Sequence, residues 1–114
     1  LKKCESEALD LPILRAKEYI AAHCESPCTL NEVAAYVHLS PAYFSSQFKK
    51  RVGISFNRYV TAAKLDVAKQ LLKQSDDTVE AISLSVGYKD IKYFRKLFKQ
   101  QVGITPSRYR SIYR

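Results

Sequence analysis

Four cationic side chains recur near the C-terminus at the spacing of one helix face: Lys92, Arg95, Lys96 and Lys99. At about 100° per residue they fill an arc of roughly 100°, and Phe94, Leu97 and Phe98 point to the opposite side. Arg can grip guanine O6 and N7, Lys contacts bases or phosphates, and an α-helix fits the major groove of DNA. The alternative is a helix packed on a core by its aromatic residues, with a solvated cationic face.

The same stretch occurs twice, fifty residues apart. Residues 43–49 (YFSSQFK) and 52–54 (VGI) recur as residues 93–99 (YFRKLFK) and 102–104 (VGI), and nine of the twenty positions from 41 to 60 are identical in the second copy. Two copies are too few for a solenoid and indicate a pair of small subdomains. In the first copy, the arc that corresponds to the four cations holds Ala42, Ser45, Ser46 and Lys49.

The first copy predicts two helices joined by a short turn. Thr29 and Glu32 form a capping box that opens a helix through about Val37. Ser40 is the expected N-cap of the second helix, which has proline as its first residue and ends near Gly53.

The second copy repeats this arrangement. We expect Asp77, with Glu80, to open one helix, Gly87 to break it and Asp90 to cap the next, which ends near Gly103. Helices separated by such short turns form the helix-turn-helix motif.

Residues 56–74 contain no Gly or Pro and predict a long helix between the copies. Its apolar residues form two stripes, one of Phe56, Val60, Ala63, Val67 and Leu71 and one of Leu65, Ala68 and Leu72. One helix with two faces to bury predicts a linker that packs against both subdomains. A first helix at about 11–23 and a last helix from Thr105-Pro106 complete the pattern. The predicted fold is all-α, with seven helices and two helix-turn-helix subdomains at about 11–53 and 77–113.

Charge is concentrated in the two copies. The 114 residues include 19 Lys and Arg against 11 Asp and Glu, a net charge of +8. Residues 41–65 carry five basic residues and no acidic one, and residues 89–114 carry eight basic and one acidic. This distribution favours a polyanionic partner. The length excludes a multidomain enzyme. The sequence has no Gly-rich phosphate loop, no nucleophile elbow and no paired-carboxylate site beyond the Asp76-Asp77 turn, so we expect neither catalysis nor a cofactor.

A zinc or thiol-redox site is the metal alternative, because Cys4, His23, Cys24 and Cys28 are suitable ligands. Their spacing matches no known zinc finger. Cys24 also continues an apolar stripe of the first helix, formed by Ile13, Ala16 and Ile20. We therefore expect Cys24 to be a small buried hydrophobe, and no metal site.

Four segments together resemble the C-terminal pattern of AraC/XylS-type transcriptional regulators: residues 79–82 (VEAI), 87–90 (GYKD), 93–99 (YFRKLFK) and 102–110 (VGITPSRYR). Residues 59–72 are similar to the central helix of that family, and the resemblance covers roughly residues 10–113. It implies two helix-turn-helix subdomains that are joined by one long helix and bind double-stranded promoter DNA, usually in bacteria.

The resemblance also implies the contact residues. Base contacts fall on Ala42, Ser45 and Ser46 in the first copy and on Ile91, Lys92, Arg95 and Lys96 in the second. Phosphate contacts fall on Lys49 and Lys99, and the expected caps Ser40 and Asp90 stand at helix N-termini, which can hold phosphate. Lys64 stands where the family usually has Arg, and Ser83 where it usually has Ala.

The expected base-contacting residues differ between the two copies. This predicts a DNA site with two unlike half-sites, which lie in successive major grooves about 34 Å apart. Ala42 and Ser45 offer weak hydrogen bonding, so we expect the second copy to carry most of the sequence selectivity.

Other partners follow from the resemblance and from what the sequence lacks. The sequence contains no Met, so we expect an upstream sensor or receiver domain, as the family usually has, to be missing from it. The resemblance implies contact with RNA polymerase. No apolar run approaches the ~20 residues that span a bilayer, and we expect a cytoplasmic location without a membrane partner.

A basic helical module that binds RNA or single strands by stacking on tyrosine, or one that binds protein, is the alternative function. Tyr59, Tyr93 and Tyr109 fall at repeat positions, which indicates structural roles for them instead.

Overall fold

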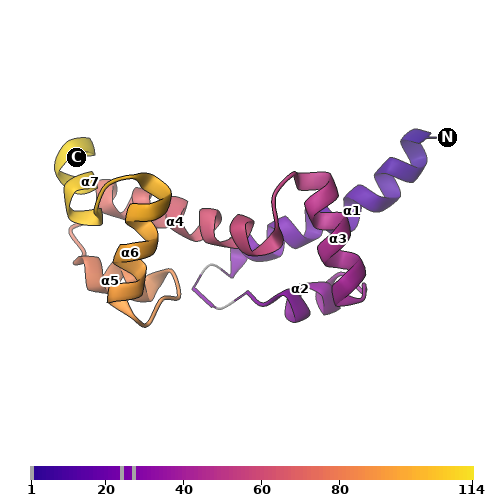
Figure 1. Cartoon of the computed structure of the whole chain (residues 1–114), viewed down its shortest axis with the longest axis horizontal. Coiled ribbons are helices and arrows are strands. Elements are labelled where there is room, and N and C mark those ends of the chain that lie inside the picture. Colours follow the sequence, from indigo (N-terminus) through magenta and orange to yellow (C-terminus); the bar gives the residue numbers. More distant parts are fainter. Residues whose placement is uncertain (1, 24, 27) are drawn as a thin grey trace. The chain divides into compact units, whose positions relative to one another are not determined.

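The protein is built from α-helices. The computed structural model describes the backbone of residues 2–23, 25–26 and 28–114, and the side chains from residue 11 onward within these ranges. This part of the chain contains seven helices and no strand, which confirms the predicted all-α fold (Figure 1). The helices are α1 (Lys2–Ala22), α2 (Leu30–Tyr36), α3 (Pro41–Val52), α4 (Phe56–Gln74), α5 (Val79–Ser85), α6 (Ile91–Val102) and α7 (Pro106–Tyr113).

The chain divides into two compact units. The first comprises Leu1–His23 and Cys28–Val60, and the second comprises Cys24–Pro27 and Thr61–Arg114. Helix α4 therefore contributes its residues up to Val60 to the first unit and the remainder to the second. Each unit contains one copy of the repeat.

Helix α1 starts nine residues earlier than predicted, at Lys2, and continues across Pro12. Proline is most often found in the first turn of a helix, a position that Pro12 would have in a helix beginning near Leu11. The preceding residues include Lys, Glu, Ala and Leu, which have high helix propensity. Their preference extends the helix toward the N-terminus.

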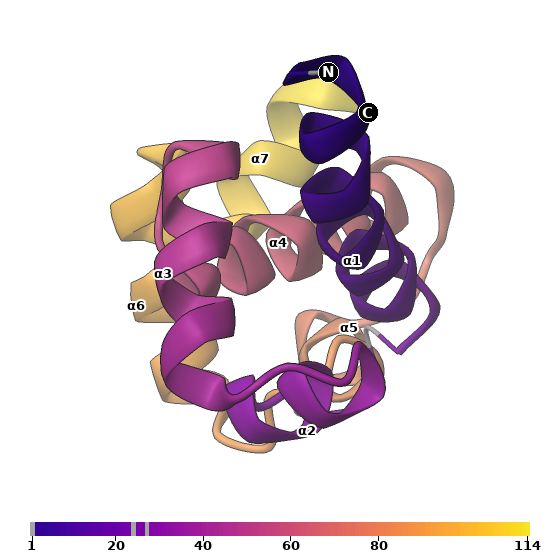
Figure 2. The ribbon, with the colours of Figure 1, turned by 90° about the vertical axis from the view of Figure 1, so that its right-hand side faces the viewer.

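The first helix-turn-helix motif has the predicted caps. The Oγ1 of Thr29 accepts a hydrogen bond from the amide of Glu32 at 3.2 Å, and the Oγ of Ser40 accepts one from the amide of Tyr43 at 3.3 Å. Helix α3 ends at Gly53, which has a left-handed φ of +96° and donates its amide to the Lys49 carbonyl. Figures 1 and 2 both show α2 leading through a short turn into α3.

The second motif differs from the prediction at its first cap. Thr78, and not Asp77, is the N-cap of α5, because its Oγ1 accepts a hydrogen bond from the amide of Ala81 at 3.1 Å. Asp77 lies one residue too early, and its amide donates to the Oγ of Ser75 instead. The caps of α6 follow the sequence, with Asp90 at its start and the left-handed Gly103 at its end.

Aromatic rings form the core of the first unit. Phe44 and Phe48 of α3 are fully buried, and both rings contact Phe56 edge to face with centroids 5.5 Å apart. On α1, Ile13, Ala16 and Ile20 are buried as predicted. Cys24 lies outside the described residues.

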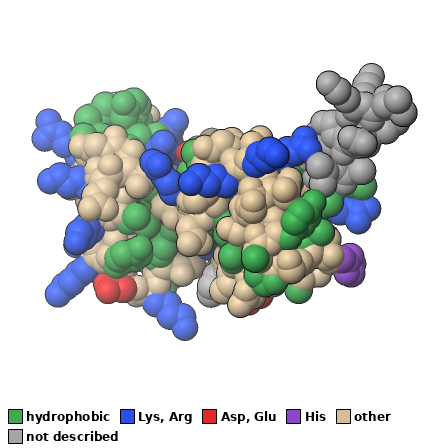
Figure 3. Space-filling model, turned by 45° about the vertical axis from the view of Figure 1, so that its right-hand side comes forward, with side chains coloured by type: hydrophobic (Ala, Val, Ile, Leu, Met, Phe, Trp, Pro, Cys, Tyr) green, Lys and Arg blue, Asp and Glu red, His purple; other side chains and the backbone are tan. Residues whose placement is uncertain are grey.

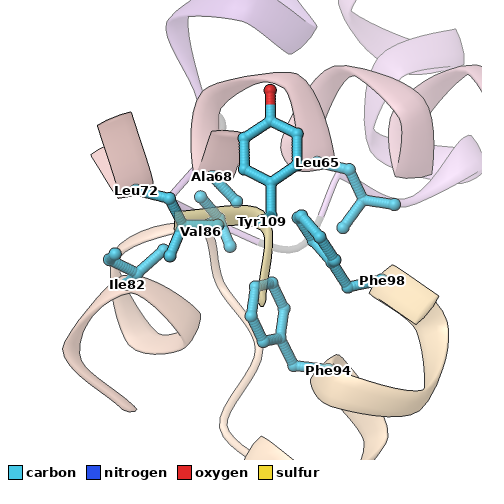
Figure 4. Packing of buried hydrophobic residues seen from close by; sticks show 8 residues of the cluster. All are labelled: Leu65, Ala68, Leu72, Ile82, Val86, Phe94, Phe98 and Tyr109. Carbon is cyan, nitrogen blue, oxygen red and sulfur yellow. The ribbon is translucent and has the colours of Figure 1, made fainter. Parts of the chain in front are cut away.

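The core of the second unit joins four helices (Figure 4). Its buried members are Leu65, Ala68, Leu72, Ile82, Val86, Phe94, Phe98 and Tyr109. The predicted stripe of α4 that contains Leu65, Ala68 and Leu72 is thus buried here. The other stripe does not form a single surface, because Phe56 and Val60 are buried in the first unit whereas Val67 and Leu71 are partly buried against this core.

Candidate nucleic-acid interface

Helix α6 is oriented by its aromatic residues. Phe94 and Phe98 are fully buried, and Figure 4 shows both rings directed toward the other members of the core. A helix with two large rings fixed in a core cannot rotate about its axis without opening a cavity, which is costly. The opposite side of α6 is therefore held toward solvent.

The four predicted cations of α6 all lie on this exposed side. Lys92, Arg95, Lys96 and Lys99 are exposed, and Ile91 is half-buried at the start of the helix. None of the four forms an ion pair with a described residue; the ion pairs of the described chain join Lys69 to Asp66 and Arg114 to Asp76. The face shown in Figure 3 likewise has many projecting Lys and Arg side chains and few acidic ones. We call Lys92, Arg95, Lys96 and Lys99 the cationic face of α6.

The start of α6 is fixed by Asp90. Its Oδ1 accepts hydrogen bonds from the amides of Lys92 at 3.0 Å and Tyr93 at 3.3 Å. Two amides that would otherwise lack partners are satisfied in this way. The cap holds the first turn, from which Lys92 projects.

The first copy has a smaller polar surface at the corresponding positions. Ala42, Ser46 and Lys49 of α3 are exposed, and Ser45 is half-buried. The hydroxyl oxygen of Ser40 accepts the Tyr43 amide, which leaves its hydrogen able to donate to another group. Only Lys49 carries a charge among these residues.

The tyrosines at the repeat positions differ in exposure. Tyr109 is buried and Tyr59 is half-buried against Phe48, with centroids 5.3 Å apart, as structural residues should be. Tyr93, however, is 53% exposed, and so is its repeat partner Tyr43 at 44%. The Tyr93 ring also contacts the Tyr88 ring, with centroids 6.0 Å apart, so its structural role stays a prediction. On a helical wheel, position 93 falls between the cationic face and the core, and this signal was available in the sequence.

Lys64 and Ser83, noted in the sequence as departures from a family pattern, are both buried. The Nζ of Lys64 donates to the carbonyls of Ser26 at 2.7 Å and Val86 at 3.1 Å. The Oγ of Ser83 donates to the carbonyl of Tyr88 at 2.7 Å. Burial raises the pKa of the Tyr88 phenol, and a hydrogen bond with Thr61 opposes this shift. Lys64 and Ser83 therefore both hydrogen-bond to the turn that precedes α6.

The described residues contain no group of three His, Cys, Asp or Glu side chains that could hold a metal ion. Cys28 is buried, and its thiol donates to the carbonyl of His23 at 3.3 Å. The side chains of Cys4 and Cys24 lie outside the described part of the chain. None of the described helices has both the length and the hydropathy needed to cross a membrane.

Two helix-turn-helix motifs, each with its second helix held outward by buried aromatic residues, define a class of DNA-binding domain. Residues 33–112 match the helix-turn-helix domain family. The chain belongs to the AraC-type branch of the helix-turn-helix transcription regulators.

Known proteins agree with this assignment. The chain is 40% identical over 101 residues to the regulatory protein PocR of Salmonella typhimurium, which covers 89% of this chain and 33% of PocR. The C-terminal domain of AraT, a response regulator from Geobacillus stearothermophilus, superposes with a TM-score of 0.85 at 33% identity, over 89% of this chain and 84% of that domain.

The DNA-binding domain of AdpA, solved in complex with a target DNA, has the same fold. Its TM-score is 0.85 at 23% identity, over 90% of this chain and 93% of that domain. The chain spans only about a third of the length of PocR.

Proposed function

We propose that this chain recognises a specific sequence in double-stranded promoter DNA, and that α6 is its main reading element. The observation that carries the proposal is the cationic face. Four exposed cations share one side of a helix whose opposite side is anchored by Phe94 and Phe98. An exposed, rigidly held helix of this kind fits the major groove.

In the second copy, Arg95 is the residue best suited to read a base, because guanidinium can donate two hydrogen bonds to guanine. Ile91, Lys92 and Lys96 are the other proposed base contacts. Lys99 is the proposed phosphate contact. Asp90 acts on the DNA backbone through the helix start, because its carboxylate caps the amides of Lys92 and Tyr93 and so fixes the first turn of α6.

In the first copy, Ala42, Ser45 and Ser46 are the proposed base contacts, with Lys49 and Ser40 directed to phosphate. Small side chains on α3 allow close approach to a groove but offer few donors. The two copies therefore recognise unlike half-sites, one helical turn apart, and the second contributes most of the selectivity.

The proposal extends to the whole regulator. PocR is a regulatory protein and AraT a response regulator, and only about a third of PocR aligns with this chain. These relatives support a regulator with a further sensor or receiver domain. We propose from the family resemblance that this regulator acts in the bacterial cytoplasm and contacts RNA polymerase.

A second candidate function has one observation in its favour. Tyr43 and Tyr93 are exposed at the same position of their helices, and exposed aromatic rings can stack on the bases of single strands. Binding of RNA or single-stranded DNA would use these rings together with the cations.

Selection of bound duplexes from a random library tests the main proposal. We expect an enriched sequence with two unlike half-sites, the stronger of which loses its preference when Arg95 is replaced. The selected duplex is then competed with each of its single strands at moderate salt. A preference for the single strand, or no enriched sequence, would contradict the proposal and favour the second candidate.

A further inference from the structure

Lys64 is a lysine in an unusual place. It projects from α4 into the second unit and is only 4% exposed. A lysine is rarely so deeply buried unless its amine is hydrogen-bonded to polar groups. Here Nζ donates to the Val86 and Ser26 carbonyls and lies 5.8 Å from the centre of the Tyr88 ring.

Two of these three partners belong to the turn between α5 and α6. Val86 is the C-cap of α5, and Tyr88 follows two residues later. The Tyr88 ring in turn contacts Phe94 of α6, with centroids 5.8 Å apart. A chain of direct contacts thus runs from Lys64 through the turn to the buried side of the helix that carries the cationic face.

Gly87 makes this arrangement possible. It has a φ of +87°, and a Cβ at this position would lie 2.9 Å from the Nζ of Lys64 and 3.1 Å from the carbonyl oxygen of Glu25. A side chain could not be accommodated unless Lys64 moved away. The turn and the lysine are therefore fitted to each other.

The first copy builds the same turn differently. His38 occupies the position of Gly87, with a φ of 61°, and its side chain is exposed. Ala34 occupies the position of Ser83 and has no hydroxyl to donate, although its carbonyl accepts the Leu39 amide at 2.9 Å. The hydroxyl hydrogen bond to the turn is thus made by Ser83 in the copy that carries the cationic face, and Ala34 cannot make it in the other.

We propose that Lys64 is a positioning residue for DNA recognition: it holds the turn before α6 and so sets the orientation in which Arg95 and Lys96 meet the bases. This inference rests on the proposed function of α6. Lys64 itself touches no DNA, because its Nζ is enclosed by protein groups.

The test compares Lys64→Met with Lys69→Met, which removes the same charge from an accessible position of the same helix. Affinity for the selected duplex and for a scrambled duplex is measured over a range of salt concentrations. We expect Lys64→Met to bind the selected duplex about tenfold more weakly and to lose base preference in the half-site read by α6. The salt slope should stay unchanged, because no phosphate contact is lost. Lys64→Arg, which keeps a cationic donor, should recover most of the preference, and Lys69→Met should resemble the parent chain.

Circular dichroism checks that each variant is folded. If the methionine variant does not fold, Lys64→Gln, whose amide keeps one donor, replaces it in the same assay. A folded variant with the parent's base preference overturns the proposal, as does an equal loss on both duplexes or a reduced salt slope. The proposed function fails separately, if the parent chain itself does not prefer the selected duplex.

Discussion

Phe98 of α6 and Tyr109 of α7 meet edge to face, with ring centroids 5.7 Å apart and an interplanar angle of 80°. Fifty residues earlier, Phe48 and Tyr59 form the same pair at 5.3 Å and 75°. Edge-to-face contact is a favoured geometry for aromatic pairs. In both units this pair ties the second helix of the motif to the helix that follows it, and so fixes which face of the second helix is exposed.

Replacement of Phe98 should therefore destabilise the second unit strongly. Phe98→Ala removes a fully buried ring, and we expect a loss of about 3 to 5 kcal/mol in the free energy of unfolding. Urea denaturation followed by circular dichroism measures it. Tyr93→Ala, on the exposed side of the same helix, is the control and should cost about 0.5 kcal/mol. Equal losses for the two variants would show that α6 is not anchored by Phe98.

Arg95→Ala tests direct base reading. The variant should bind the selected duplex about 1 to 3 kcal/mol more weakly and lose its preference at one base pair of the stronger half-site, because the guanidinium donors are gone. Arg15→Ala, which removes an exposed arginine from α1, is the matched control and should bind like the parent. Equilibrium titrations and a repeated selection measure the two effects. An unchanged affinity and enriched sequence would exclude Arg95 as a base contact.

Lys99→Ala tests the phosphate contact. It should weaken binding to all duplexes by a similar factor and reduce the salt slope by about 1, because one fewer counterion is released. Titrations at several salt concentrations, with Lys69→Ala as control, measure the slope. A loss confined to the selected duplex would instead place Lys99 on a base.

Two glycines with similar backbone conformation should respond differently to alanine. Gly103 has a φ of +98° with open space around it, so Gly103→Ala should cost only the strain of a left-handed residue, about 1 kcal/mol. Gly87→Ala adds a collision with the carbonyl of Glu25 and the amine of Lys64, and should cost about 1 kcal/mol more. Thermal or urea unfolding of both variants measures the two losses in the free energy of unfolding. Equal losses in the free energy of unfolding would mean that Lys64 and Glu25 move away from the new methyl group without cost.

Much of the fold was predictable because its signals are local. Ser40 and Asp90 cap helices through contacts within three residues, and Gly53 and Gly103 end them through the conformation of single residues. Phe94 and Phe98 lie on one side of α6 by helical spacing alone. The exposure of Lys92, Arg95, Lys96 and Lys99 follows from that spacing once the aromatic residues are buried.

The errors have local causes as well. At the start of α5, Thr78 and Asp77 are both good capping residues, and which one lies at the right distance depends on the backbone of the preceding loop. Helix α1 crosses Pro12, against the usual preference of proline for a first turn.

The sequence by itself determined the helices, the duplication and the positions of the cations on α6, since these depend on residues a few positions apart. Only the tertiary structure decided the role of Lys64. Its partners Ser26 and Val86 lie 38 and 22 residues away along the chain, and a Cβ on Gly87 would collide with its Nζ. Contacts over such separations depend on how helices pack, and no periodicity in the sequence encodes them.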